Sequence, residues 1–535
     1  MLIRGGTGPD RGTMLAAPRA GAPVAGLAPR RPSNALAYGV VASTVAFAVV
    51  YVGALLEALD GVDATPLALS VIGLKTVVEI GASSYGFSFL LGSIFYLALR
   101  EPERLHSELA DPPPVGIVYL CCNDFDAGAL ESLTRLRYRG TVYLVVHDDS
   151  AAANHARIDA AVERLRADAP MAVVLLRRPV REGGKPGALN YVLAETGHLY
   201  EYFLLCDNDS TAVDGDAIEK AMAYTADPSV GAVQCRSIAV DSPTYCTVNR
   251  LLAQSVNIFH LFLATYSRFG WSPFIGHNAI LSTQAVRDAG GFTPDYFSDD
   301  LDLTVRLNLR GYSVAYAPEI HFGEKHPPSY DSLRRRSYKW AYGCVQVLRA
   351  HGWAVLSSRK LRFAEKLAFF QFSGFYVGQT ILLGYLALTF LVAPFVLARY
   401  DFDVPLGVVA GTVILLVIFL PSFSYLLKSR RLRGSGRSLL LCGLIYGATD
   451  FSCAHGVLDA VRRRKRQWIP SNAPTAIRGH RTLVGEACFG LALLSVPLLT
   501  VPAVLYMPCS YLFVGKFLFG PAMSLLYDDD KAGIA

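Results

Sequence analysis

Acidic side chains follow three short apolar runs of this sequence, each directly after the run ends. The motifs are Asn123-Asp124, Asp148-Asp149 and Asp207-Asn208-Asp209. In parallel sheets ligands bind beyond the carboxyl ends of the strands, so motifs in this position meet at one edge. The two carboxylates of Asp207 and Asp209 can face one divalent cation, and Mg²⁺ or Mn²⁺ prefers such hard oxygen ligands. The same pattern also occurs in solvated turns, but the shared edge favours a metal site.

A second acidic group, Asp299, Asp300 and Asp302, follows a Gly-Gly-Phe turn. Carboxylates are favoured at a helix N-terminus by the helix dipole, which is the alternative role for Asp299 or Asp302. Clustered carboxylates also raise one another's pKa, and a raised pKa suits a general base. Asp300 is the candidate base.

The stretch Glu182–Gly187 combines three glycines with Lys185. Glycines allow close backbone approach, and a lysine can neutralise a diphosphate. A plain surface turn is the alternative. The stretch is not a P-loop, because the GxxxxGK[ST] spacing is absent.

The strands and helices that must position these aspartates and Lys185 are predicted to form an α/β segment. The predicted strands are Val115–Cys121, Thr141–Val146, Met171–Leu176, Tyr202–Cys206 and Val230–Gln234, with helices at Ala156–Ala167 and Lys185–Thr196. Short apolar strands that alternate with helices indicate a mostly parallel sheet covered on both faces.

Composition points to a membrane. Hydrophobic residues make up 52% of the 535 residues and charged residues only 18%, which excludes a disordered chain, a coiled coil and a collagen-like chain. The net charge of +6 is too small to indicate nucleic acid, and the ten cysteines, with no CxxC pair, read as reduced thiols. The uncharged runs are Pro32–Leu56, Ile80–Leu99, Leu367–Ala398, Val404–Leu427 and, as two short spans, Ala487–Tyr527. About 20 apolar residues cross a bilayer, so six spans are expected.

Basic residues predict the orientation. Lys and Arg precede the first span, follow the second and fourth, and precede the last pair. By the positive-inside rule, both termini and the segment 100–366 face the cytoplasm at the plasma (inner) membrane. Ser438–Ala460 lies between two basic clusters and is predicted as an interfacial helix. Residues 1–31 are predicted to be a disordered tail.

The motif series resembles that of family 2 glycosyltransferases. The segments that carry it, in order, are Val118–Asp124, His147–Ser150, Gly184–Asn190, Leu204–Ser210, Ile275–Leu281, Gly290–Leu303 and Lys339-Trp340. More narrowly, residues 80–480 resemble the membrane-embedded cellulose, hyaluronan, chitin-oligosaccharide and curdlan synthases. The resemblance implies a GT-A fold and inverting, metal-dependent transfer from a nucleotide sugar, usually a UDP-sugar, with Mg²⁺ or Mn²⁺ as cofactor.

The resemblance also implies residue roles. It makes Asp300, in a Ser-Asp-Asp that stands where the family has TED, the catalytic base. The nucleotide-sugar-binding residues it implies are Asn123, Asp124, Asp148, Asp149, Lys185 and Asp207, with Asp207 and Asp209 on the metal. The acceptor-binding residues it implies are Asp299, Arg336, Lys339, Trp340, His277 and Asn278.

Two segments depart from the family pattern. Processive synthases carry QxxRW, where this chain has Arg336 and Lys339 before Trp340. Losing the planar guanidinium is not a neutral change, which puts long-chain processivity in doubt. Trp468 and Ser471 lie where cellulose synthases have an FxVTxK gating loop, but the Lys is missing. His321 and His326 do not make an HExxH helix, so zinc is not expected.

The expected organisation is an α/β GT-A-like cytoplasmic domain inserted into an α-helical transmembrane region. Its parts are a tail (1–31), spans one and two (32–99), the GT-A domain (100–330), interfacial helices with the acceptor motif (331–366), spans three and four (367–427), an interfacial helix with the gating loop (428–482), and spans five and six (483–535).

The expected function is polymerisation of a β-linked polysaccharide from a nucleotide sugar, with translocation of the product. The expected partners are the donor, a glycan or lipid acceptor and membrane lipids. A non-processive enzyme that adds one sugar to a lipid or short glycan is the first alternative. A transporter with a nucleotide-binding regulatory domain is the second.

Overall fold

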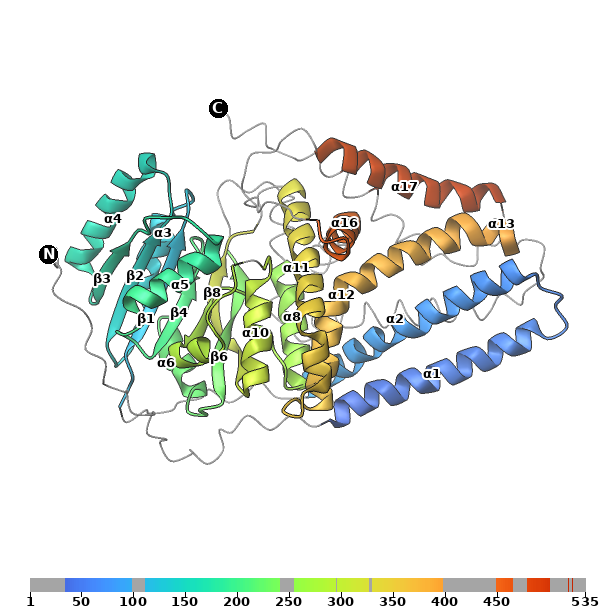
Figure 1. Ribbon diagram of the computed structural model, residues 1–535, viewed down its shortest axis with the longest axis horizontal. Coiled ribbons are helices and arrows are strands. Elements are labelled where there is room, and N and C mark those ends of the chain that lie inside the picture. The colour runs from blue at the N-terminus through green and yellow to red at the C-terminus, as the bar shows by residue number, and fades with distance from the viewer. Residues whose placement is uncertain are drawn as a thin grey trace.

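The computed structural model describes residues 34–98, 111–240, 255–294, 296–326, 330–397, 449–464 and 479–500, with isolated residues 518 and 522 (Figure 1). An eight-stranded sheet forms one end of this part of the chain, and long helices extend from the other (Figure 1). The strands are β1 (Val115–Cys121), β2 (Val142–Asp148), β3 (Ala172–Leu176), β4 (Tyr202–Cys206), β5 (Thr211–Ala212), β6 (Val230–Ala239), β7 (Ala279–Ser282) and β8 (Ser313–Glu324).

The sheet order is β3-β2-β1-β4-β7-β6-β8-β5. β3, β2, β1 and β4 are parallel neighbours, β7 runs antiparallel to β4 and β6, β6 and β8 are parallel, and β5 is antiparallel to β8. All the strands predicted from sequence form. The sheet is mixed, because β7 and β5 run in the opposite direction to the other strands. The sequence did not predict these two strands.

Helices cover both faces of the sheet. All residues of β1 are buried, which explains why its sequence is continuously apolar. On one face the core is completed by α3 (Ala127–Leu133), α4 (His155–Asp168) and α6 (Ala217–Tyr224). On the other it is completed by α5 (Gly184–Thr196), α9 (Thr283–Asp288) and α10 (Asp299–Arg310). This doubly covered sheet brings the carboxyl ends of β1, β2, β4 and β8 to one edge.

Three helices among the described residues are long and apolar enough to cross a membrane. They are α1 (Ala35–Leu59), α2 (Pro66–Ala98) and α12 (Phe363–Ala387), which continues through a π-helical turn η2 (Leu388–Val392) into α13 (Ala393–Leu397). The chain is therefore an integral membrane protein. The predicted fourth span lies outside the described residues, and of the predicted last pair only the part within α17 (Gly479–Thr500) is described.

The second span corrects the sequence prediction. The uncharged run predicts this span at residues 80–99, because Lys75 and Glu79 interrupt the run. In the structure the apolar helix covers Pro66–Gly92. The two charges are tolerated because they pair: Lys75 Nζ lies 3.2 Å from Glu79 Oε1. Lys75 also donates to the Tyr385 hydroxyl (3.1 Å) and to Thr389 Oγ1 (3.3 Å) in the π-helical turn. The Tyr51 and Tyr385 hydroxyls donate to Glu79, so this polar cluster joins α1, α2 and α12.

A further helix, α11 (Tyr330–Ser357), crosses the ends of these long helices, between them and the sheet (Figure 1). α16 (Asp450–Val461) packs against it: the Tyr338 hydroxyl donates to Asp459 Oδ2 (2.9 Å), and Gly456 lies against the Tyr338 carbonyl. The Arg334 guanidinium is buried with Glu486 of α17, at 2.9 Å. Of the interfacial helix predicted at 438–460, only residues from 449 on are described, and they form α16; its place at the membrane surface stays a prediction.

We predict that Glu79→Leu destabilises the protein, because it leaves Lys75 as an unpaired cation between apolar helices. Breaking a buried pair from one side costs about 3–5 kcal/mol. Chemical unfolding of the purified protein in detergent measures this. The double variant Lys75→Met/Glu79→Leu should recover most of the loss, and a double variant as unstable as the single one would contradict the pairing argument.

Candidate active site

The end of β1 forms one wall of a cavity of about 310 Å³. Asn123 adopts a left-handed conformation (φ 66°), and its Oδ1 accepts a hydrogen bond from the Ala151 amide at 2.7 Å. Its own amide donates to Ser150 Oγ (2.8 Å), which ties the loops after β1 and β2 together. The cavity is lined by Asn123, Asp124, Phe125, Asp126, Asn154, Arg157, Ile158, Asn208 and Lys325. Two predicted donor-binding residues, Asn123 and Asp124, therefore face one cavity.

This cavity can hold a flat polar ligand. The Arg157 guanidinium lies 5.4 Å from the Phe125 ring centre and donates to the Phe125 carbonyl, so the pair presents an ordered surface. Burial raises the pKa of Asp124, although its carboxylate accepts from the Cys122 amide at 2.7 Å. Sequence reasoning missed Phe125, Asn154 and Arg157, since no spacing marks them as partners of the strand ends.

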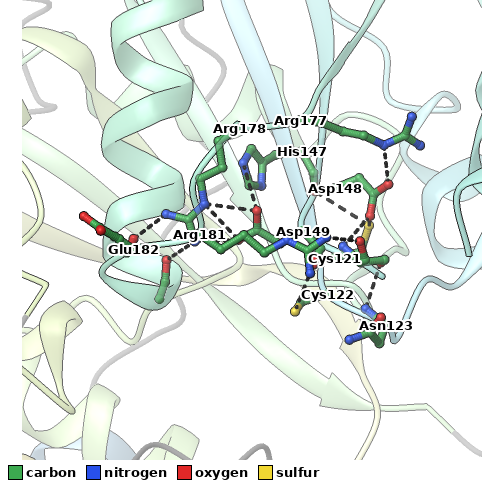
Figure 2. Close-up of polar contacts among 12 residues, drawn as sticks. Cys121, Cys122, Asn123, His147, Asp148, Asp149, Arg177, Arg178, Arg181 and Glu182 are labelled. Carbon is green, nitrogen blue, oxygen red and sulfur yellow. Dashed lines mark hydrogen bonds and ion pairs between the residues drawn. The ribbon is translucent and has the colours of Figure 1, made fainter. Parts of the chain in front are cut away.

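The two aspartates at the end of β2 are bound by arginines that follow β3 (Figure 2). Arg177 Nε donates to Asp148 Oδ2 (2.7 Å), and Arg178 donates to Asp149 Oδ2 (2.6 Å). Hydrogen bonds from Ser150 and Arg177 lower the pKa of Asp148 despite its burial. Arg178 also donates to the Glu182 and Gly184 carbonyls, which fixes the loop before α5. The structure thus places Asp148 and Asp149 as anchors of this loop, and a contact to a nucleoside stays a prediction.

The glycines of that loop place Lys185. Gly183 adopts φ 70°, and a Cβ at Gly187 would lie 2.1 Å from the Glu182 carbonyl oxygen, so a side chain there would force the loop apart. Lys185 Nζ then reaches Asp207 Oδ1 at 2.5 Å and the Gly276 carbonyl at 2.9 Å. Although burial opposes the charge, Asp207 and Asp299 raise the pKa of Lys185. Lys185 therefore stays a cation among the acids.

Asp207 and Asp209 face a third carboxylate, Glu324 at the end of β8. His277 joins two of them: its Nε2 lies 3.2 Å from Glu324 Oε2 and its Nδ1 lies 3.8 Å from Asp207 Oδ2. Burial opposes protonation, but Glu324 and Asp207 raise the pKa of His277 to about 9. Burial, with the charges of Glu324 and Asp207, raises the pKa of Asp209 to about 7. His277 is thus a cation at neutral pH.

Asp299 and Asp300 begin α10. Burial, together with the charge of Asp300, raises the pKa of Asp299 to about 7, and burial raises the pKa of Asp300. Gly276 (φ 90°) borders them, since a Cβ there would lie 3.3 Å from Asp300 Oδ2. Burial therefore makes the Asp300 carboxylate more basic than an exposed aspartate, as a proton acceptor requires.

Helix α11 holds the loop that leads directly into these two acids. A Cβ at Gly343 would meet Ser298 Oγ at 2.3 Å, so helix and loop touch directly. The Phe297 amide donates to Gln346 Oε1 (3.1 Å), and His351 Nε2 lies 2.7 Å from Asp302 Oδ1. Asp302 is therefore a positioning residue at the start of α10.

The acceptor motif lies on α11 beside this site. The Arg336 guanidinium is 4.7 Å from the Trp340 ring centre, and its Nη1 is 3.9 Å from Glu324 Oε1. Phe259 stacks with Trp340, with ring centres 6.0 Å apart. Burial and the neighbouring Arg335 lower the pKa of Lys339 to about 8. The predicted acceptor residue Asn278 is buried, adopts φ 51° and donates to Ser237 Oγ (3.1 Å), which makes it a framework residue.

The structure therefore unites most of the predicted site at one sheet edge. Trp468 and Ser471, the predicted gating residues, lie outside the described residues. Glu324 and Lys325 were missed because β8 was not recognised as a strand. No group of three or more His, Cys, Asp or Glu is already arranged as a metal site in the described part of the chain.

Comparisons with known proteins match this arrangement. The family model "Glycosyl transferase family group 2" matches residues 202–427, which include the DxD motif, Asp300 and α11. A beta-monoglucosyldiacylglycerol synthase of Synechocystis is 28% identical over 246 residues, 45% of this chain and 50% of its own length. Glucomannan 4-beta-mannosyltransferase 2 of Arabidopsis thaliana is 26% identical over 212 residues, 38% of each chain. The matched segment is thus similar to family 2 glycosyltransferases, among them hexosyltransferases.

Two further findings concern the length of the relatives and one solved structure. The chain spans about half, or less, of the length of the curated relatives that it matches. Among solved structures, a mannosyltransferase from Pyrobaculum calidifontis, in complex with GDP-Man and Mn²⁺, aligns with a TM-score of 0.49 at 17% identity, over 73% of this chain and all of its own.

We predict that Glu324→Gln lowers the pKa of His277 from about 9 toward the ordinary value of about 6.5. Removing the carboxylate removes the charge that holds the imidazole protonated in its buried site. Histidine-selective NMR titration measures the shift. The control is Glu319→Gln, whose carboxylate accepts from Tyr224 instead and should leave His277 unchanged. Titration of His277 near 9 in the Glu324 variant would contradict the assignment.

Proposed function

We propose that this protein transfers a sugar from a nucleotide sugar to an acceptor hydroxyl with inversion, and that it builds a β-linked glycan. The observation that carries the proposal is the placement of two acidic groups around Lys185. Asp207 Oδ1 binds its ammonium at 2.5 Å, and the charges of Asp299 and Asp300 also act on it. Attack at an anomeric carbon needs both a base and a site for the leaving diphosphate.

The donor fits along the sheet edge. The nucleoside occupies the cavity at Asn123 and Asp124, with Phe125 and Arg157 as its outer wall. The diphosphate then reaches Lys185 and the cationic His277, and their charges neutralise the charge that develops on the leaving group. A UDP-sugar is the expected donor, and the donor panel must include GDP-sugars.

The chemical step needs one proton acceptor. The acceptor hydroxyl gives its proton to the Asp300 carboxylate while its oxygen bonds to the anomeric carbon. The bond from that carbon to the diphosphate oxygen breaks, and the nucleoside diphosphate leaves. The raised pKa of Asp300 matches its basicity to this task.

A divalent cation would fit beside Asp209 and Asp207, because burial and the charges of Glu324 and Asp207 raise the pKa of Asp209, and a cation there would relieve that repulsion. Asp209, helped by Asp207, would hold Mg²⁺ or Mn²⁺ together with phosphate oxygens of the donor. The ion would supply charge neutralisation to the departing diphosphate.

A single sugar addition to a lipid or short glycan is the second candidate. The Arg336 guanidinium covers one face of Trp340, 4.7 Å from the ring centre. A sugar of a growing chain would stack on such a face, so this contact favours a single addition. The relatives include both glucomannan mannosyltransferases and a glycolipid synthase. For either product, we propose that the sheet domain and both termini face the cytoplasm, as the basic loops predict.

We predict that Asp300→Asn lowers turnover by about 10²–10⁴-fold, the usual contribution of a general base. Nucleotide affinity should stay within a small factor, since Asp300 is not part of the cavity that holds the nucleoside. Transfer of radiolabelled sugar and calorimetric nucleotide binding separate the two effects. Asp168→Asn, at the exposed end of α4, is the matched control and should keep full turnover. Undiminished transfer by the Asp300 variant would remove the proposed base.

We predict that Asp209→Asn abolishes the metal dependence of donor binding, because it removes the carboxylate nearest the proposed cation. EDTA should stop transfer by the wild-type protein, and Mg²⁺ or Mn²⁺ should restore it. Donor binding with and without metal is measured by calorimetry. Equal stimulation of the variant and the wild type by metal would exclude Asp209 as a ligand.

A further inference from the structure

The corner between α11 and α12, residues 353–366, exposes large apolar side chains. Trp353 is 78% exposed, Leu356 is 53% exposed and Phe363 is 39% exposed in the described structure. Contiguous exposed apolar side chains mark sites of contact with a protein or a membrane. The neighbouring buried residues, such as Gly352 and Val355, face the protein core instead.

The contacts of the corner place it where spanning helices enter the membrane. A Cβ at Gly352 would lie 3.7 Å from the Phe370 ring, so the end of α11 lies beside the first two turns of α12. The Phe363 ring stacks with Tyr38 at the start of α1 (5.4 Å), and the Ala364 amide donates to Asn34 Oδ1 (3.2 Å). α1 and α12 therefore begin at the same level, and the end of α11 lies beside the start of α12 (Figure 1).

Cations surround the apolar side chains. Arg359 and Lys360 are exposed, and Lys360 Nζ reaches the carbonyl of the exposed Arg310 at 3.2 Å. Lys366 Nζ donates to the Leu356 carbonyl (2.7 Å), which holds its charge beside the apolar group. The one acid of residues 353–366 is Glu365, and its carboxylate already accepts from the Arg362 amide at 2.7 Å. The corner is thus apolar at its centre and cationic at its rim.

We propose that this corner binds the acidic headgroups of the bilayer surface, with Trp353 and Leu356 inserted at the headgroup level and Arg359 and Lys360 on the lipid phosphates. Tryptophan is enriched at the membrane–water boundary, and lysine and arginine near the surface are attracted to acidic lipids. An aromatic centre with a cationic rim matches the acidic surface of a bilayer. An uncharged protein partner would leave the cations unexplained, and an acidic one would not explain why Trp353 lies beside the start of α12.

The same helix leads from this corner to the site. His351, two residues before Trp353, contacts Asp302, and Gln346 and Gly343 hold the loop that carries Asp299 and Asp300. The corner therefore lies on the same helix that contacts Asp302 and the loop before α10.

The test uses lipids that carry bromine, which quench tryptophan fluorescence on contact. The full chain is placed in nanodiscs that contain brominated phosphatidylglycerol or, at the same mole fraction, brominated phosphatidylcholine. The chain has four tryptophans, and comparison with Trp353→Phe isolates the signal of Trp353. We expect Trp353 to be quenched by both lipids and more strongly by the acidic one.

The charge variants decide what causes the preference. Arg359→Gln/Lys360→Gln should make the two lipids quench equally, whereas Arg164→Gln/Arg166→Gln, on exposed positions of the distant α4, should keep the preference. Equal quenching in the wild type, or loss of the preference in the α4 variant, overturns the acidic-headgroup site. Absence of Trp353 quenching by either lipid overturns it as well, because a second copy or a protein partner would then cover the corner.

Discussion

The ion pair between Lys185 and Asp207 is the interaction on which the rest of the site depends. Five carboxylates meet at this edge of the sheet: Asp207, Asp209, Asp299, Asp300 and Glu324. Lys185 Nζ lies 2.5 Å from one of them and is held there by the Gly276 carbonyl. Without a cation between the two acidic groups, like charges in a buried setting would protonate or separate. Gly183 and Gly187 act to keep Lys185 in place, as does Arg178, which binds both Asp149 and the backbone before α5.

The second constraint is mechanical and comes from α11. It contacts the loop before α10 on one side and α12, α16 and α17 on the other. The buried pair of Arg334 and Glu486 fixes one end, and the contact of His351 with Asp302 fixes the other. The proposed base is therefore carried by the sheet domain but positioned by α11, which also packs against the apolar helix α12.

Much of this could be predicted from the sequence, and the failures have physical causes. The acids after β1, β2 and β4 were found because buried parallel strands are continuous apolar runs. β8 was missed because Pro318, His321 and Gly323 break its apolar pattern, and Glu324 was lost with it. The second span was cut short at Lys75 and Glu79, since a sequence does not show that two charges pair with each other and with Tyr385 from a distant helix. The roles of Arg177 and Arg178 depend on strand order, which spacing alone does not give.

The central claim is that the edge with Lys185 at its centre transfers a sugar from a nucleotide donor. Incubation of the purified protein with a panel of UDP- and GDP-sugars, in the presence of Mg²⁺ or Mn²⁺, tests it most directly. The account predicts release of nucleoside diphosphate from one donor together with a glycosylated product, whose size distinguishes a polymer from a single addition. A folded protein that binds the nucleotide but transfers sugar from none of these donors, to glycan or to lipid acceptors, would contradict it.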